Sequence, residues 1–169
     1  DFADLWIDEN KISWRKSHRT SIEGILAKHV MPVFGAMPLE TIKREHILQF
    51  RSQLSELKGK NGNGILSNSR INKIMSTLRQ VLNEAALRYD FTTPYQNIKQ
   101  LKSKPKDIHP FSLGEVSRII EKVRSDYKNY YTVRFFTGMR TGEIDGLKWR
   151  YVDFERRLIL VRETIVNGE

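Results

Sequence analysis

A single arginine lies between two glycines in the stretch FFTGMRTGEIDGLKW, residues 135–149. Gly138 suits the end of one helix, because glycine adopts the left-handed conformation that many helix C-termini require. The next helix is predicted to begin at about Arg140, so its guanidinium would lie at a helix N-terminus, where free N–H groups and the helix dipole favour anions. The planar fork of donors on arginine matches a phosphate. These residue types at this spacing are those of a binding site for one phosphate group.

Glu143 follows Arg140 by three residues, about one helical turn, and can hold the guanidinium in place. An ordinary structural Arg–Glu pair at the start of a helix has the same spacing. The pair alone therefore leaves both interpretations open, and the rest of the chain has to distinguish them.

The chain is basic and contains no cysteine, with 29 Lys and Arg against 20 Asp and Glu and a net charge of +9. Residues 1–106 carry 18 Lys and Arg against 10 Asp and Glu, whereas residues 107–169 carry 11 against 10. Such an excess attracts polyanions, most simply nucleic acid, although a basic surface without a partner has the same composition.

The composition also excludes several classes of protein. Without cysteine there are no disulfides, thiolate zinc sites or cysteine nucleophiles, which fits a cytoplasmic setting. No apolar run approaches the ~18 residues of a membrane span, and the scattered histidines lack the spacing of a metal site. The first residue is not Met, so we expect a piece of a longer protein.

Hydrophobic residues recur at helical spacing through the first two-thirds of the chain. They predict a short opening helix near Phe2 and Trp6, followed by helices over residues 17–35, 42–57 and 68–89. The second helix is predicted to end at Pro32 and Gly35, and His29 on its apolar stripe is predicted to be a core residue. The third is predicted to bury Ile47, Phe50, Leu54 and Leu57. The fourth is predicted to bury residues from Ile71 to Ala86 and to expose Lys73, Thr77, Gln80, Glu84 and Arg88. Such helices form a compact bundle.

The remaining third of the chain reads differently. Residues 99–110 are basic, contain two prolines and have no hydrophobic stripe, so they are predicted to be a linker. Ser112 and Glu115 have the spacing of a capping box, and a helix with Ile119, Ile120 and Val123 on its buried face follows. Two further helices, over about 128–137 and 140–148, precede a predicted strand at 156–165. A lone strand is not stable, so its partners are expected to be missing or poorly supplied.

The segment TGMRTGEIDGLKWRYVDFERRLILV resembles the arginine-box region of the tyrosine recombinases, the phage integrase family. That family shows the pattern T-G-x-R-x-x-E-x-x-x-L-x-W-x-x-[VI]-[DN]. Eight positions fit it: Thr137, Gly138, Arg140, Glu143, Leu147, Trp149, Val152 and Asp153. Residues 67–91 resemble the last long helix of the family's core-binding domain, and residues 109–120 resemble the start of its catalytic domain.

The resemblance implies a mainly α fold with three parts. Residues 1–98 would be a helical, SAM-like core-binding domain that contacts DNA, and residues 99–110 a basic linker. Residues 111–169 would be the N-terminal part of an α+β catalytic domain, truncated and with a short β-strand or hairpin at its C-terminal end.

The resemblance also implies a reaction without metal, ATP or another cofactor. In this family a tyrosine attacks the scissile phosphate of double-stranded DNA, giving a 3′-phosphotyrosine, and strands are exchanged within a tetramer. Arg140 matches the first catalytic arginine, and Glu143 matches the supporting acid. The catalytic lysine, the His-x-x-Arg motif and the nucleophilic tyrosine are not matched: all four histidines precede Arg140, and Tyr151 comes too early. We expect the chain as given to bind DNA and to cleave nothing.

For DNA contact the resemblance indicates the N-terminal ends of two helices. The expected residues are Arg19, Thr20, Ser69, Arg70, Lys73 and Thr77, whose hydroxyls and cations suit phosphate oxygens. Lys102, Lys104 and Lys106 in the linker could follow the DNA backbone electrostatically. Each of these residues could equally be an ordinary solvated side chain. Trp6, Trp14 and Trp149 are predicted to be packing anchors.

Three functional hypotheses remain at this stage. The first is a site-specific DNA recombinase, catalytic when full length. The second is a non-catalytic DNA-binding module or regulator with the same fold. The third is a helical protein–protein adaptor with incidental positive charge, which predicts no binding to duplex DNA even at low salt.

Overall fold

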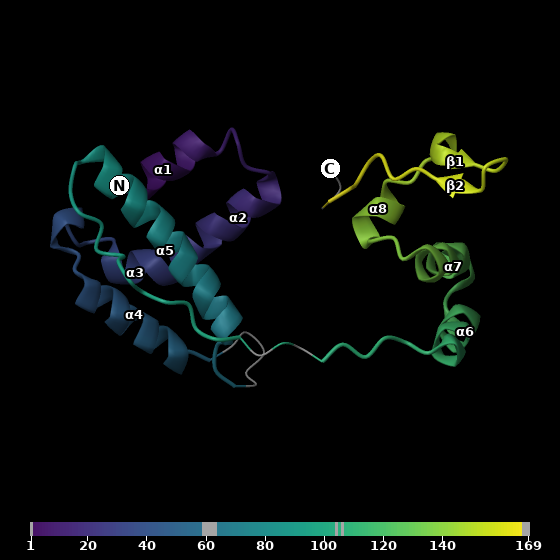
Figure 1. The fold of residues 1–169 in the computed structure, drawn as a ribbon, viewed down its shortest axis with the longest axis horizontal. Coiled ribbons are helices and arrows are strands. Elements are labelled where there is room, and N and C mark those ends of the chain that lie inside the picture. Colours follow the sequence, from purple (N-terminus) through teal and green to yellow (C-terminus); the bar gives the residue numbers. More distant parts are fainter. Residues whose placement is uncertain (1, 59–63, 104, 106, 167–169) are drawn as a thin grey trace. The chain divides into compact units, whose positions relative to one another are not determined.

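The computed structural model of the protein describes residues 2–58, 64–103, 105 and 107–166 (Figure 1). The chain divides into two compact units, Asp1–Pro105 and Lys106–Glu169, which we call the helical unit and the C-terminal unit. Both are mainly helical, and the C-terminal unit adds a small antiparallel sheet, so the predicted fold class is confirmed. Among the helices of the described residues, none combines the length and apolar character needed to cross a membrane.

Within its described residues, the helical unit contains five α-helices, one π-helical turn and one 3-10 turn. They are α1 (Phe2–Asn10), α2 (Lys16–Ile25), η1 (Leu26–Val30, π), α3 (Met31–Phe34), η2 (Leu39–Thr41, 3-10), α4 (Arg44–Glu56) and α5 (Asn68–Arg88). The 21-residue α5 was predicted nearly to its bounds, because its apolar stripe keeps the helical period without interruption.

Pro32 does not end the second helix, contrary to the prediction. The π turn η1 lets Met31 donate its N–H to the carbonyl of Leu26, five residues back. Pro32 then occupies the first turn of α3, where a missing N–H costs little. The helical path α2–η1–α3 therefore continues through Pro32 and ends at Phe34, with Gly35 as its C-cap.

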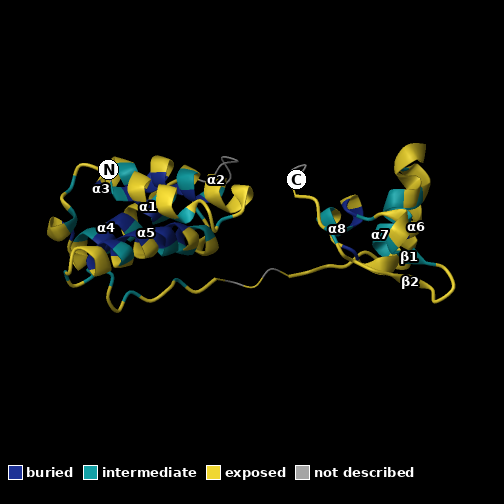
Figure 2. Cartoon of the chain, turned by 90° about the horizontal axis from the view of Figure 1, so that it is seen from above, coloured by how far each residue is buried: buried dark blue, intermediate teal, exposed yellow. Residues whose placement is uncertain are grey.

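The core of the helical unit is continuous, and Figure 2 shows its buried residues along the inward faces of the helices. Ile25, Ile47, Ile71, Ile74 and Leu78 are among its most buried side chains. The rings of Phe34 and Phe50 pack edge to face, with centroids 5.2 Å apart. His29 is buried as predicted.

The exposure predicted for two residues, one on α5 and one at the end of α4, was wrong. Thr77 was expected on the polar face of α5 but is only 1% exposed, and its hydroxyl donates to the carbonyl of Lys73, 3.2 Å away. Threonine can satisfy its hydroxyl within its own helix and bury its methyl group, so polarity alone misplaced it. Leu57 was expected in the core but is 44% exposed, because α4 ends at Glu56 and the chain becomes extended there.

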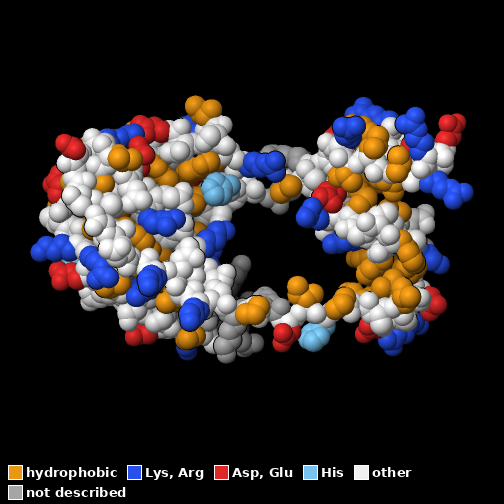
Figure 3. All heavy atoms as spheres, in the orientation of Figure 1, with side chains coloured by type: hydrophobic (Ala, Val, Ile, Leu, Met, Phe, Trp, Pro, Cys, Tyr) orange, Lys and Arg blue, Asp and Glu red, His pale blue; other side chains and the backbone are white. Residues whose placement is uncertain are grey.

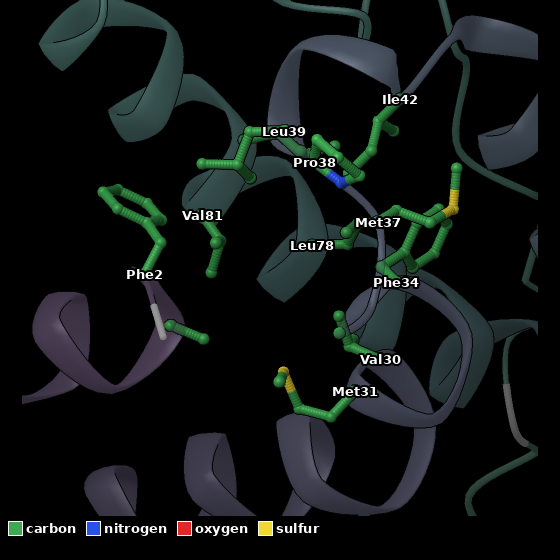
Figure 4. Close-up of a pocket in the computed structure, with 13 residues that line it drawn as sticks. Phe2, Val30, Met31, Phe34, Met37, Pro38, Leu39, Ile42, Leu78 and Val81 are labelled. Atoms are coloured by element: carbon green, nitrogen blue, oxygen red, sulfur yellow. The ribbon is translucent and has the colours of Figure 1, made fainter.

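An apolar cavity of about 290 Å³ lies within the helical unit (Figure 4). Its lining comes from α1, η1, α3, the turn after α3 and α5, and includes Phe2, Met31, Met37, Leu39 and Val81. Every lining side chain is apolar, so the cavity does not suit a phosphate or another anion.

The C-terminal unit contains α6 (Leu113–Lys122), η3 (Ser125–Tyr127), α7 (Lys128–Thr137), α8 (Thr141–Asp145), η4 (Trp149–Tyr151), β1 (Val152–Asp153) and β2 (Leu158–Ile159). The capping box before α6 is confirmed: Glu115 donates its N–H to Ser112 Oγ (3.3 Å), and its carboxylate accepts from the Ser112 N–H (2.8 Å). Ile119 and Ile120 are only half-buried.

Helix 140–148 and strand 156–165 are both shorter than predicted. Helix α8 has five residues and ends at Asp145, with Gly146 as its C-cap. The strand is reduced to β2, which pairs with β1 in the register Val152↔Ile159 and Asp153↔Leu158. The predicted short hairpin is thus confirmed, with two paired positions, and a reversal with Arg157 at φ 55° folds the chain back on itself.

The tryptophans do not all serve as packing anchors. Trp6 is buried and meets Trp14 edge to face at 5.0 Å, as predicted. Trp149 instead is 82% exposed and stacks on the equally exposed Phe154, with ring centroids 6.4 Å apart. The prediction for Trp149 was therefore wrong.

Candidate nucleic-acid interface

The Arg140 turn is built by two helix ends that follow each other closely. Helix α7 ends at Gly138, whose φ of 70° is the left-handed conformation predicted for it. Gly138 donates its N–H to the carbonyl of Arg134 (3.0 Å). Met139 is buried, and Arg140 has extended backbone as the N-cap of α8. This sequence of conformations positions Arg140 at the junction of the two helices.

Glu143 holds Arg140 through both backbone and side chain. The N–H of Arg140 donates to Glu143 Oε2 and its Nη1 to Glu143 Oε1, each over 2.8 Å. The backbone hydrogen bond and the guanidinium together lower the pKa of the Glu143 carboxyl. The side chain of Glu143 is 18% exposed, whereas that of Arg140 is 86% exposed. The predicted contact is confirmed, and it leaves most guanidinium donors facing outward.

Two glycines, Gly142 in α8 and Gly146 at its C-cap, allow the C-terminal segment to lie against this helix. Ile165 donates its N–H to the carbonyl of Gly142 (2.9 Å). A Cβ on Gly142 would lie 2.6 Å from the carbonyl oxygen of Ile165, and one on Gly146 would lie 2.8 Å from that of Glu163. Sequence analysis missed this contact, although glycines four apart share one face of a helix and were a visible signal.

Glu163 joins the same segment to the turn that follows α8. Its carboxylate accepts hydrogen bonds from Lys148, Arg150 and Tyr151, of which the Arg150 bond is 2.8 Å long. These donors, Lys148 first, lower the pKa of Glu163 to about 2. Through these contacts with α8 and with the turn that follows it, residues 163–165 support the Arg140 turn.

In the helical unit, the first turn of α5 carries the predicted basic residues. Ser67 caps this helix by accepting the N–H of Arg70 (3.3 Å), and Ser69 and Lys73 are exposed, as are several other Lys and Arg side chains on the face shown in Figure 3. Burial lowers the pKa of His29, and the charges of Arg70 and Lys28 lower it further. Arg70 of α5 and Lys28 of η1 therefore both lie close enough to His29 for their charges to act on its ring.

Lys28 was not among the expected DNA-contacting residues. It is exposed, and its charge, like that of Arg70, acts on His29. The sequence does not reveal the position of Lys28, because a regular helical period does not hold there. The π turn adds one residue to a helical turn and so changes the direction of the side chains that follow Leu26.

Arg19 lies in different surroundings from Ser69, Arg70 and Lys73 of α5. Its Nε pairs with Glu23 Oε1 at 2.6 Å, and it lines a depression between α1 and α2 together with Asp8 and Glu23. Arg19 is thus grouped with acidic side chains, while Thr20 beside it is exposed.

The remaining expected contacts have different outcomes. Thr77 is buried, so its hydroxyl cannot reach a phosphate without a change in α5. Lys102 is exposed, whereas Lys104 and Lys106 lie outside the described residues.

Comparison with known proteins gives a consistent result. The sequence profile of the phage integrase N-terminal SAM-like domain matches residues 1–55. The ICEBs1 integrase of Bacillus subtilis is 29% identical over 153 residues, covering 88% of this chain and 40% of the relative. The prophage integrase IntR of Escherichia coli is 26% identical over 178 residues, covering 98% of this chain and 42% of the relative.

A solved structure shares the fold. The Tn1549 transposon integrase, solved in complex with a circular intermediate DNA, matches with a TM-score of 0.69 and 17% identity over 95% of this chain and 52% of that one. The chain thus shares the fold of this integrase. The chain is thus similar to phage-type integrases along most of its length, and it spans about two-fifths of the length of the curated relatives named above.

Proposed function

We propose that the protein is a phage-type, site-specific DNA recombinase of mobile genetic elements, of which this chain supplies two DNA-contacting units and the first catalytic arginine. The observation that carries the proposal is the geometry of Arg140. Its backbone and guanidinium are both held by Glu143, yet its side chain is 86% exposed. Within the eight-position family motif, this arrangement suits binding to a phosphate of double-stranded DNA.

In the proposed chemistry, Arg140 stabilises the negative charge that grows on the non-bridging oxygens of the scissile phosphate. Glu143 orients the guanidinium and takes no part in bond making. Since the turn is set by Gly138 and supported by Ile165, the guanidinium needs little reorganisation when DNA binds.

The proposal assigns strand cleavage to the longer protein. A tyrosine would attack the phosphate and form a 3′-phosphotyrosine, releasing a 5′-hydroxyl, and exchange would occur in a tetramer on DNA. The lysine, the His-x-x-Arg motif and the nucleophilic tyrosine of the family pattern have no match in these 169 residues. The chain by itself is expected to bind DNA without cleaving it.

The helical unit would bind phosphates mainly through the start of α5. Ser69, Arg70 and Lys73 there, with Lys28 nearby, support this proposal, because they gather cations at a helix N-terminus. Arg19 would contribute less because Glu23 already pairs with it, and Thr20 would add a hydroxyl contact. We leave Thr77 out because it is buried.

Binding of this chain to duplex DNA at several salt concentrations tests the proposal. We expect the logarithm of the binding constant to fall linearly with the logarithm of salt concentration. Arg70→Gln and Lys73→Gln should each reduce the slope by about 0.9, the value for one phosphate contact. Fluorescence anisotropy with a labelled duplex measures this directly.

Lys11→Gln is the matched control, because Lys11 is an exposed cation of the same unit that already pairs with Asp8 at 2.9 Å. It should leave the slope unchanged. Absence of binding at low salt would favour the adaptor hypothesis and overturn the proposal. If the longer protein binds DNA but forms no covalent adduct with a nicked suicide substrate, it is a non-catalytic regulator.

A further inference from the structure

The chain turns back on itself after α5 and returns along the helix it has just left. Asp90, with φ 51°, takes the left-handed position after the helix, and Phe91 donates its N–H to the carbonyl of Ala86 (3.1 Å). Thr93 then donates its hydroxyl to Asn83 (2.8 Å). These contacts close a tight reversal at the C-terminal end of α5.

Residues 95–102, which we call the strap, then lie on the helical unit as an extended segment (Figure 1). Tyr95, Ile98 and Leu101 are half-buried against its core. Asn97 has φ 55°, so the strap bends there, and only the parts before and after Asn97 are extended. The strap includes the first part of the segment predicted to be a linker.

Side chains from two helices hold the strap by its backbone. From α4, Arg44 donates to the carbonyl of Gln96 (3.2 Å) and Arg51 to that of Lys99 (3.2 Å). From α5, Asn68 donates to the carbonyl of Lys102 (2.7 Å). An extended segment has no hydrogen bonds of its own, so these contacts replace those of regular structure.

Asn72 makes the most specific of these contacts. Its Nδ2 donates to the carbonyl of Leu101 (2.8 Å), and its Oδ1 accepts the Leu101 N–H (2.9 Å). One amide side chain thus satisfies both backbone groups of one residue, as a neighbouring strand would. Asn72 is half-buried, which shields this pair of bonds from competing water.

The strap moves the exit of the chain from one end of α5 to the other. Helix α5 has 21 residues and is therefore roughly 30 Å long. The chain leaves it at Arg88, but the last bond to the helical unit is made by Asn68, the first residue of α5. The exit thus lies at the same helix end as Ser69, Arg70 and Lys73.

We propose that Asn72 is a positioning residue, whose hold on the strap couples the two DNA-contacting units by fixing where the connection between them begins. The inference rests on the proposed function. With the strap attached, about 10 residues separate Lys102 from the Ser112 cap of α6; with it released, about 24 separate Arg88 from that cap. The effective concentration of one unit near the other falls as about the −3/2 power of length for a flexible connection, here roughly fourfold.

Asn72→Ala in the whole chain tests the inference with two measurements. Without DNA, the Leu101 amide should exchange with solvent about tenfold faster or more, because its acceptor is lost. With a duplex long enough for both units, affinity should fall, by at most roughly fourfold, which is the value for complete release of the strap. Gln80→Ala is the matched control: it also removes an amide from α5, but one that bonds to the Ser76 carbonyl within the helix.

Arg51→Met is a second variant, and it acts from α4, so it does not depend on the integrity of α5. Faster exchange across the strap and weaker DNA binding in both variants would support the inference. Unchanged Leu101 exchange in Asn72→Ala would overturn it, and so would faster exchange with unchanged affinity. If the unaltered chain binds no DNA, the proposed function and the coupling fail together, while the exchange data still decide whether Asn72 holds the strap.

Discussion

The two units place their apolar and charged residues in different ways. The helical unit buries a continuous set of apolar side chains around α5. Among the described residues of the C-terminal unit, the only hydrophobic side chains buried to that degree are Val116, Met139 and Ile144. Yet the most preorganised cation of the chain, Arg140, belongs to the C-terminal unit. The cations of the helical unit lie on helix surfaces. The difference suggests that packing maintains the first unit, whereas capping contacts and close backbone approach shape the second.

A pair of matched core substitutions tests the contrast most strongly. Ile74→Ala removes a fully buried side chain from α5 and should destabilise the helical unit by about 2–5 kcal/mol. Ile120→Ala removes a half-buried side chain from α6, and the cost to the C-terminal unit should be about half of that or less.

Denaturation followed by fluorescence measures the first effect, because Trp6 and Trp14 both report on the helical unit. Hydrogen exchange of the α6 amides measures the second. Equal losses from the two substitutions would show that the C-terminal unit depends on packing as much as the helical unit does.

The difference between the cations is tested in the longer protein. Arg140→Ala should reduce DNA cleavage by about 10²–10³-fold, the usual effect of losing one preorganised oxyanion donor. DNA affinity should change little, since many other phosphate contacts remain. Arg70→Gln should do the reverse, weakening affinity while leaving cleavage at saturating DNA nearly unchanged. Covalent-adduct formation and anisotropy separate the two effects, and equal losses in both assays for both variants would contradict our division of roles.

Two glycine substitutions test whether close approach of backbone segments shapes the C-terminal unit. Gly142→Ala places a methyl group 2.6 Å from the Ile165 carbonyl oxygen, so the C-terminal segment must shift, at a cost of about 1–3 kcal/mol. Gly24→Ala in α2 meets nothing within 4 Å and should stabilise the helical unit by about 0.5–1 kcal/mol. Thermal denaturation, monitored at backbone amides of each unit, checks that Gly142→Ala destabilises its unit and that Gly24→Ala stabilises its own. A neutral Gly142→Ala would mean that segment 163–165 does not support the Arg140 turn.

The smallest expected effect is a dependence on pH within the C-terminal unit. The pKa of Glu163 is lowered from its ordinary value of 4.5 to about 2, so its contacts contribute stability above about pH 4.5 and are lost as pH falls towards 2. The Ile165 amide should lose protection from exchange over that range, and Glu163→Gln should abolish the dependence. Glu155→Gln, at an exposed position of the hairpin, should leave the dependence unchanged.

The sequence predicted best the features that depend on local rules. The apolar stripe of α5, the capping box at Ser112 and the helix end at Gly138 were all recognised, because propensity, capping and burial agree there. The contact between Arg140 and Glu143 was predicted for the same reason, since both residues belong to one helical turn.

Features that depend on distant partners were not predicted. The π turn at Leu26–Val30 changes the helical period, and no residue type announces it. The bonds between Asn72 and Leu101 join residues 29 apart, so the part of the strap from Lys99 onward looked like a linker by composition. Trp149 was assigned to the core by its type, and Thr77 to the surface by its polarity, yet both side chains have the opposite exposure.

The bond between Ile165 and Gly142 also has a consequence for biosynthesis. The helical unit has all its core residues by Leu101, so it can fold while the ribosome is still translating the rest of the chain. The Ile165–Gly142 bond that supports the Arg140 turn cannot form until Ile165 has been added, roughly 1–5 s after Arg140 at usual elongation rates. During that interval the nascent chain carries a folded, basic N-terminal portion and an unfinished phosphate-binding turn, so its first encounters with DNA would involve the former.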